Sequence, residues 1–141
     1  SAALKDAVSR GLPLHFITEF EIYRPRLFWF NKKATSGHME WRLSYYALTR
    51  QYRLNSASGS ESYATLDEAI TQMTALRDWP VTTIDRLDAG EEYIVRVRMR
   101  LDTAQLPKPF QITALTDSDW NPQSEWKGLS FVVPTQPTPA P

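Results

Sequence analysis

The 141-residue sequence predicts a mainly β domain: an antiparallel β-sandwich, of which an immunoglobulin-like topology is one form, with one main α-helix near residues 66–78. Several short segments alternate apolar and polar residues with a period of two, which is typical of half-buried strands. Only one longer segment has apolar residues at clear helical spacing. An α+β sheet is the alternative, since the same elements are compatible with it.

The strongest strand pattern spans 92–102, where apolar residues alternate with arginines: Tyr93, Val95, Val97, Met99 and Leu101 point one way. Further strands are expected at 14–23, 39–48, 49–55, 110–115 and 128–133. In the first of these, Thr18 is a polar exception on an otherwise apolar face. The stretch NSASGS at 55–60 indicates a flexible turn or loop.

Two helices are expected. Residues 2–10 form a short one that stops at Gly11. The main helix begins after Thr65, an N-cap with Glu68 three residues later, and ends before Pro80. Prolines at 107 and 109 predict irregular structure there, because proline lacks a backbone donor and restricts the preceding residue. We expect one β-rich domain over residues 1–133 and a proline-rich disordered tail over 134–141.

Composition narrows the function. Sixteen basic and sixteen acidic side chains balance, so no long-range field favours nucleic acid as a partner. Cysteine is absent, which excludes disulfides, thiolate catalysis and cysteine-based zinc sites. The longest apolar run, Leu27–Phe30, is too short for a transmembrane segment.

The segment YRPRLFWFNKK, residues 23–33, has two interpretations. Arg24, Arg26 and Trp29 are residue types that bind single-stranded nucleic acid. Aromatic residues are equally typical of strands, and we favour a strand over 27–30 followed by a turn at NKKATSGH. Arg96, Arg98 and Arg100 share one strand face and could bind a polyanion, but we favour pairing with Glu19 and Glu21 across the sheet.

Catalytic and metal-binding patterns are sparse. His15 and His38 are the only histidines, on a strand and in a turn, without a third ligand at metal spacing. DSDWN, residues 117–121, resembles the start of a calcium loop, but Pro122 stands where glycine is needed. We therefore expect no cofactor and no metal.

Several segments resemble one family: VSRGLPLHF, RPRLFWFNKK, WRLSYYALTRQYRL, VRMRLDTAQLPKPFQ and DWNPQSEWKGLSF. They are similar to the DUF4390 family of exported proteobacterial proteins over most of residues 4–133. The resemblance implies a periplasmic or extracytoplasmic location, with a leader and one or two strands ahead of the part that matches Ala3. It also implies a neighbouring gene for a membrane two-component sensor kinase.

These observations favour a non-enzymatic, extracytoplasmic protein-interaction module, with that sensor kinase or another envelope protein as partner. The predicted contact residues are Arg24, Arg26, Trp29, Arg96, Arg98 and Arg100. One alternative is a binding domain for an anionic polymer or lipid, which would use the arginines with Tyr46 or Trp120. A hydrolase is the other, and it requires His15, His38 and carboxylates to converge in a cleft.

Overall fold

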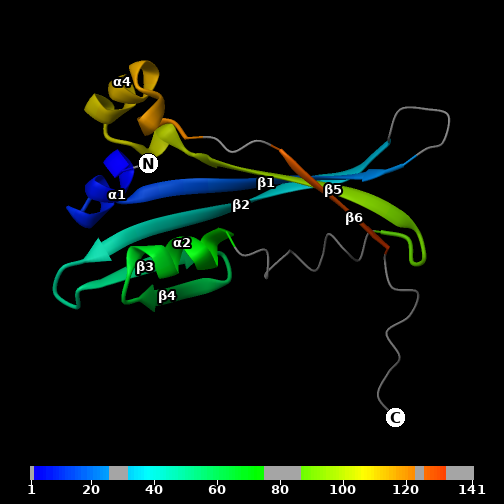
Figure 1. Cartoon of the computed structure of the whole chain (residues 1–141), viewed down its shortest axis with the longest axis horizontal. Coiled ribbons are helices and arrows are strands. Elements are labelled where there is room, and N and C mark those ends of the chain that lie inside the picture. The colour runs from blue at the N-terminus through cyan, green and yellow to red at the C-terminus, as the bar shows by residue number, and fades with distance from the viewer. Residues whose placement is uncertain (1, 26–31, 75–86, 123–125, 133–141) are drawn as a thin grey trace, which may run out of the picture. The chain divides into compact units, whose positions relative to one another are not determined.

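The computed structural model describes residues 2–25, 32–74, 87–122 and 126–132, and it confirms a mainly β fold with helices. One six-stranded sheet has the strand order β4-β3-β2-β1-β5-β6 (Figure 1). A sandwich requires a second sheet, and the described residues contain one sheet. The strands are β1 (Leu14–Arg24), β2 (Lys32–Tyr46), β3 (Gln51–Ser56), β4 (Gly59–Tyr63), β5 (Glu92–Leu101) and β6 (Lys127–Val132).

The helices are α1 (Ala2–Ser9), α2 (Leu66–Thr74) and α4 (Lys108–Thr116), with short 3₁₀ turns η1 (Thr103–Gln105) and η2 (Ser118–Trp120). None of the helices in the described ranges is both long and apolar enough to cross a membrane. The expected strand at 27–30, the end of the main helix beyond residue 74 and the tail at 134–141 lie outside the described residues.

The turn predicted within residues 55–60 is the tight turn of the β3–β4 hairpin, whereas the turn predicted at 31–38 is replaced by strand over residues 32–38. Asn55 and Ser60 are cross-strand partners, so the expected loop is a hairpin in which Ser56 pairs with Gly59. Gly59 has a φ of +133°, a conformation that suits glycine in such a turn. The turn expected at NKKATSGH is wrong, because residues 32–38 belong to β2.

The chain consists of two compact units, each with more contacts inside it than to the other. The described part of unit 1 comprises residues 2–18, 38–74 and 99–122, and that of unit 2 comprises residues 19–25, 32–37, 87–98 and 126–132. The expectation of a single domain over residues 1–133 stays a prediction.

The core of unit 1 packs apolar residues of the helices against strands β1, β2, β3 and β5. Thr18 lies in this interior although it is polar, and its hydroxyl oxygen accepts a hydrogen bond of 3.0 Å from Trp41 Nε1. The bond satisfies both buried polar groups, which explains how an exception to the apolar pattern is tolerated. The buried members are Leu4, Val8, Leu14, Trp41, Leu43, Leu54, Ala69, Met73, Leu101, Leu106 and Ala114.

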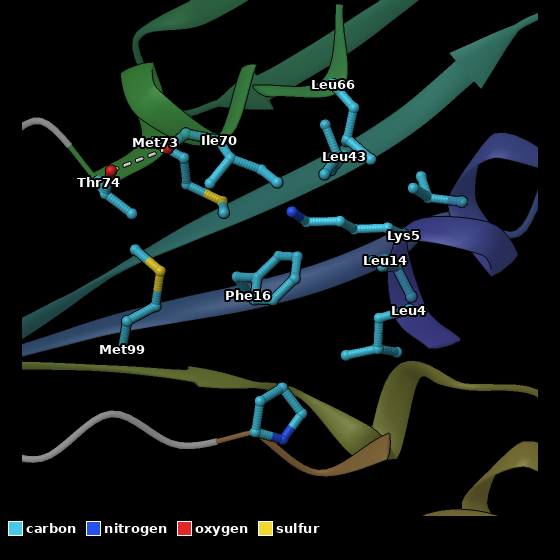
Figure 2. Close-up of a pocket in the computed structure, with 12 residues that line it drawn as sticks. Leu4, Lys5, Leu14, Phe16, Leu43, Leu66, Ile70, Met73, Thr74 and Met99 are labelled. Atoms are coloured by element: carbon cyan, nitrogen blue, oxygen red, sulfur yellow. Dashed lines mark hydrogen bonds between the residues drawn. The ribbon is translucent and has the colours of Figure 1, made fainter. Parts of the chain in front are cut away.

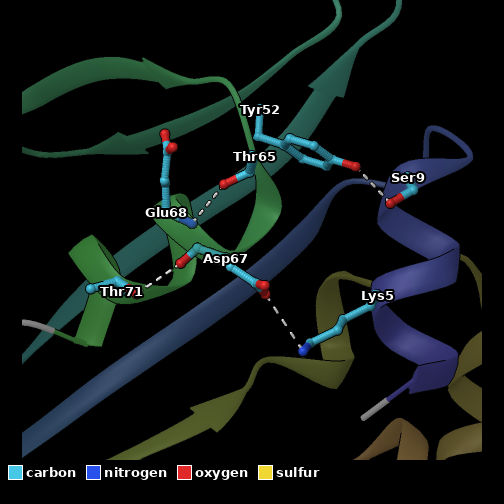
Figure 3. Close-up of polar contacts among 7 residues, drawn as sticks. All are labelled: Lys5, Ser9, Tyr52, Thr65, Asp67, Glu68 and Thr71. Carbon is cyan, nitrogen blue, oxygen red and sulfur yellow. Dashed lines mark hydrogen bonds and ion pairs between the residues drawn. The ribbon is translucent and has the colours of Figure 1, made fainter.

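The predicted start of the main helix is confirmed by α2. The backbone N–H of Glu68 donates to Thr65 Oγ1 at 3.2 Å, which satisfies one of the free donors of the first turn (Figure 3). The buried face of α2, formed by Ala69 and Met73, contacts the core, and this helix lies against β3 and β4 (Figure 1).

The strand predicted at 110–115 is wrong, because these residues belong to α4. Proline is well suited to the first turn of a helix, where the missing N–H would have no partner anyway. Pro109 lies in that turn, and the carbonyl of Pro107 accepts from the N–H of Phe110 at 2.9 Å. The two prolines therefore begin a helix and do not prevent regular structure.

Unit 2 has a smaller core built on β1 and β5, consisting of Phe20, Ile22, Leu87, Tyr93 and Val95 with Val97 packed against it. The Tyr93 ring is buried, and its hydroxyl accepts from the backbone N–H of Asp88 at 2.9 Å. This bond ties the turn before β5 to the interior.

Gly37 supplies a test of this core. A Cβ at residue 37 would lie 2.6 Å from Phe20 Cζ, and the Phe20 ring is buried. Because a packed interior resists added volume, we expect Gly37→Ala to lower the free energy of unfolding by about 1–3 kcal/mol in urea denaturation. Gly128→Ala is the matched control, since the nearest atom to its added Cβ is 4.0 Å away. Equal stability of the two variants would contradict the close packing.

Candidate functional site

The arginines of β5 meet glutamates of β1 within unit 2, which confirms the favoured pairing for two of the three. Arg98 Nη2 donates to both carboxylate oxygens of Glu19, at 3.1 and 3.2 Å. Arg96 Nη1 lies 4.0 Å from Glu21 Oε1. Arg100 lies on the same strand but belongs to unit 1.

Trp126, just before β6, completes the cluster and was not anticipated from the sequence. The guanidinium carbons of Arg98 and Arg96 lie 4.5 and 5.0 Å from the centre of its ring, within the range of cation–π attraction. Val97 pairs with Lys127, so Trp126 stands one residue before the paired part of β6. The strand expected at 128–133 is confirmed over residues 128–132, but its register could not be predicted from spacing.

One nitrogen of the Arg98 guanidinium lacks a hydrogen-bond partner. Its Nε is buried and has no hydrogen-bond partner among the residues that the structure describes. The side chains of Arg98 and Glu19 are 23% and 27% exposed. Their ion pair is thus shielded more than an ordinary surface pair, and less of Arg98 is available to a ligand.

Arg24 also has acidic partners within unit 2. Its Nη2 lies 3.0 Å from Glu91 Oε1, and its Nη1 lies 3.6 Å from Asp88 Oδ2. The carboxylate-rich turn before β5 therefore neutralises Arg24. The other two predicted contact residues, Arg26 and Trp29, lie outside the described residues.

The two histidines lie on strands of unit 1, His15 on β1 and His38 on β2, so the prediction of a turn at His38 is wrong. His38 Nε2 is 3.8 Å from Glu40 Oε1, and the negative charges of Asp102 and, more weakly, Glu40 act to raise the pKa of His15. Burial and, next, the positive charge of Arg42 outweigh this effect and lower the pKa of His15 below its ordinary value. Neutral imidazole is the favoured form of His15.

Over the described ranges, no group of three or more histidine, aspartate or glutamate side chains is placed to hold a metal ion. In the segment that resembles a calcium loop, Asp117 Oδ1 accepts from the N–H of Asp119 at 3.0 Å and so caps η2. Its carboxylate has a structural role.

Helix α4 presents an exposed apolar face that sequence reasoning missed. Phe110 stacks on Trp120 with ring centres 5.0 Å apart, and Ala114 is buried on the same side of the helix. Ile112 and Leu115 therefore point outward, 66% and 86% exposed. Reading 110–115 as a helix that starts with proline would have separated these two faces.

The model of a family described as a domain of unknown function, DUF4390, matches residues 1–130. This chain belongs to the DUF4390 family. Among the curated proteins and the solved structures, nothing matches this chain.

The lowered pKa of His15 predicts how the stability of this DUF4390 member depends on pH. The folded-state pKa of His15 lies below the unfolded value of about 6.5. The contribution of neutral His15 to the free energy of unfolding is therefore fully present above that pH, and it is lost as the pH falls through the folded-state pKa. Urea denaturation at about pH 7.5 and pH 5.5 measures this loss. His15→Gln should reduce it, whereas the exposed-site control His38→Gln should leave it unchanged. An equal loss in wild type and His15→Gln would contradict this role.

Proposed function

We propose that this DUF4390 member is a non-enzymatic protein-interaction module of the bacterial periplasm. Its partner in this proposal is the external region of a membrane two-component sensor kinase. The observation that carries the proposal is the outward face of α4, where Ile112 and Leu115 are exposed although both are large and apolar. Exposed apolar side chains one helical turn apart are typical of helix-mediated recognition.

The chemistry of this face indicates what it would contact. Lys108, Ile112 and Leu115 are spaced by four and three residues, which places them in one row along the helix. All three are exposed. A partner surface with an apolar groove and a flanking carboxylate would match this row.

The row is held firmly in place. Gln111 Nε2 donates to the carbonyls of Leu106 at 2.8 Å and Ala104 at 3.2 Å, which ties the start of α4 to the preceding 3₁₀ turn. The stacked rings of Phe110 and Trp120 anchor its inner side. Little backbone ordering would then oppose binding.

The alternative ligand, an anionic polymer or lipid on the β5 arginines, receives less support. Arg98 is engaged by Glu19, and Arg96 stands beside Glu21, so a polyanion would have to displace one carboxylate for each cation. Arg24 is in the same situation with Glu91. These pairs make the cluster locally neutral, and a neutral surface attracts anions weakly.

The α4 face can be tested by titrating the purified protein with the external region of the sensor kinase. We expect Ile112→Ser and Leu115→Ser each to weaken binding by about tenfold or more, because each removes an apolar anchor. Lys108→Glu should weaken it further if a carboxylate lies opposite. Thermal denaturation should show wild-type stability, since these side chains are exposed.

Leu48→Ser is the matched control, because Leu48 is also a fully exposed leucine of unit 1 but lies in the turn after β2. It should bind as wild type does. Failure of the kinase region to form a complex in repeated affinity capture, or full binding by the double variant Ile112→Ser/Leu115→Ser, would refute the proposal.

A further inference from the structure

Unit 1 contains an apolar pocket between helices α1 and α2 and the adjoining strands (Figure 2). Its volume is about 240 Å³. The residues that line it include Leu4 and Val8 of α1, Ile70 and Met73 of α2, Phe16 of β1 and Met99 of β5.

The pocket is partly open to solvent, so a ligand can enter it without unfolding the surrounding helices. An apolar cavity of about 150 Å³ admits benzene, and pockets for drug-sized ligands begin near 300 Å³. The pocket falls between these sizes, so it can hold a single alkyl chain of medium length but is too small for a two-chain lipid. Met73 and Met99 on its walls are flexible and can adjust to a chain.

Lys5 is the one charged residue among those that line the pocket. Figure 2 shows its side chain reaching from α1 across the lining, with the nitrogen directed toward the region between Phe16 and Ile70. Thr74 is the other polar lining residue, but its hydroxyl donates to the carbonyls of Ile70 and Thr71 at 2.9 and 3.2 Å. The Lys5 ammonium is therefore the group suited to fix the polar end of a ligand.

The present partner of Lys5 is held loosely. Lys5 Nζ lies 3.7 Å from Asp67 Oδ1 (Figure 3), and the two side chains are 54% and 87% exposed. Exposed ion pairs contribute little to stability. A ligand anion can take the place of the Asp67 carboxylate, which then returns to solvent without leaving a buried charge.

We propose that this pocket binds a free fatty acid of medium length, with its alkyl chain against Phe16 and Met99 and its carboxylate on Lys5 Nζ. The apolar walls exclude a polar chain, and the single cation selects an anionic head group. This site shares no residue with the outward face of α4, so it goes beyond the proposed function, and either can fail while the other holds.

Calorimetric titration of the whole chain with decanoate, and with decanol as its uncharged counterpart, tests the assignment. We expect saturable one-to-one binding of both, with decanoate the tighter. Lys5→Gln should weaken decanoate about fivefold and leave decanol within about twofold, because only the carboxylate meets the cation. Asp67→Asn should tighten decanoate by removing the competing anion.

Arg10→Gln is the matched control for the charge change. Arg10 follows directly after α1 and pairs with Asp6 at 3.1 Å, yet it does not line the pocket. It should leave both ligands unaffected. An equal loss of decanoate binding in Lys5→Gln and Arg10→Gln would overturn the role of Lys5.

Ile70→Trp tests the pocket itself, because the larger ring fills it, and Ile70→Leu is the control of equal volume. We expect the first to abolish binding of both ligands and the second to retain it, with folding checked by thermal denaturation. If Ile70→Trp does not fold, the test rests on the affinity for decanoate of the other two variants, which Lys5→Gln should lower and Asp67→Asn should raise. Absence of saturable binding by wild type, or wild-type binding by folded Ile70→Trp, would overturn the proposal.

Vesicles of phosphatidylglycerol distinguish a free fatty acid from the acyl chain of a membrane lipid. Sedimentation with vesicles that is lost in Ile70→Trp, together with no binding of decanoate, would overturn the assignment to a free fatty acid. Binding of decanoate without sedimentation supports it.

Discussion

The register of β1 against β5 is the constraint on which unit 2 depends. Glu19 meets Arg98 and Glu21 approaches Arg96, so two residues forward along β1 correspond to two residues back along β5, as antiparallel neighbours require. A slip of one residue would turn every side chain to the other face. Phe20 would then leave the core, and the charged rows would lose their partners. One alignment thus satisfies both the apolar face and the charged face.

This pairing also shapes how the surface can be used. Cations that are neutralised within the sheet and stacked on Trp126 contribute to folding, and they leave little net charge for recognition. The recognition that we propose therefore uses apolar groups placed by helices, the row on α4 and the pocket beside α1 and α2. In both places a single lysine, Lys108 or Lys5, adds polarity to an otherwise apolar surface.

Local patterns predicted much of this fold. The alternation in β5, the Thr65 cap of α2 and the glutamate–arginine pairing all depend on residues close in sequence or on matching spacing. What could not be predicted depends on tertiary neighbours. By sequence, Gly37 is typical of a turn. Only the fold shows that the Phe20 ring occupies the space where a Cβ at residue 37 would lie. The pocket likewise needs helices 60 or so residues apart to meet the same strands. The α4 face could not be predicted for a different reason, because closely spaced prolines are typical both of irregular segments and of the first turn of a helix.

A double-mutant cycle on Glu19 and Arg98, followed by urea denaturation, measures whether the arginines are structural. Arg98 Nη2 donates to both carboxylate oxygens of Glu19, and both side chains are mostly shielded from solvent. We predict that Glu19→Gln and Arg98→Gln together cost less than the sum of the single changes, with a coupling energy of about 1–2 kcal/mol. Strict additivity would show that Arg98 does not depend on Glu19 and is free to bind another anion.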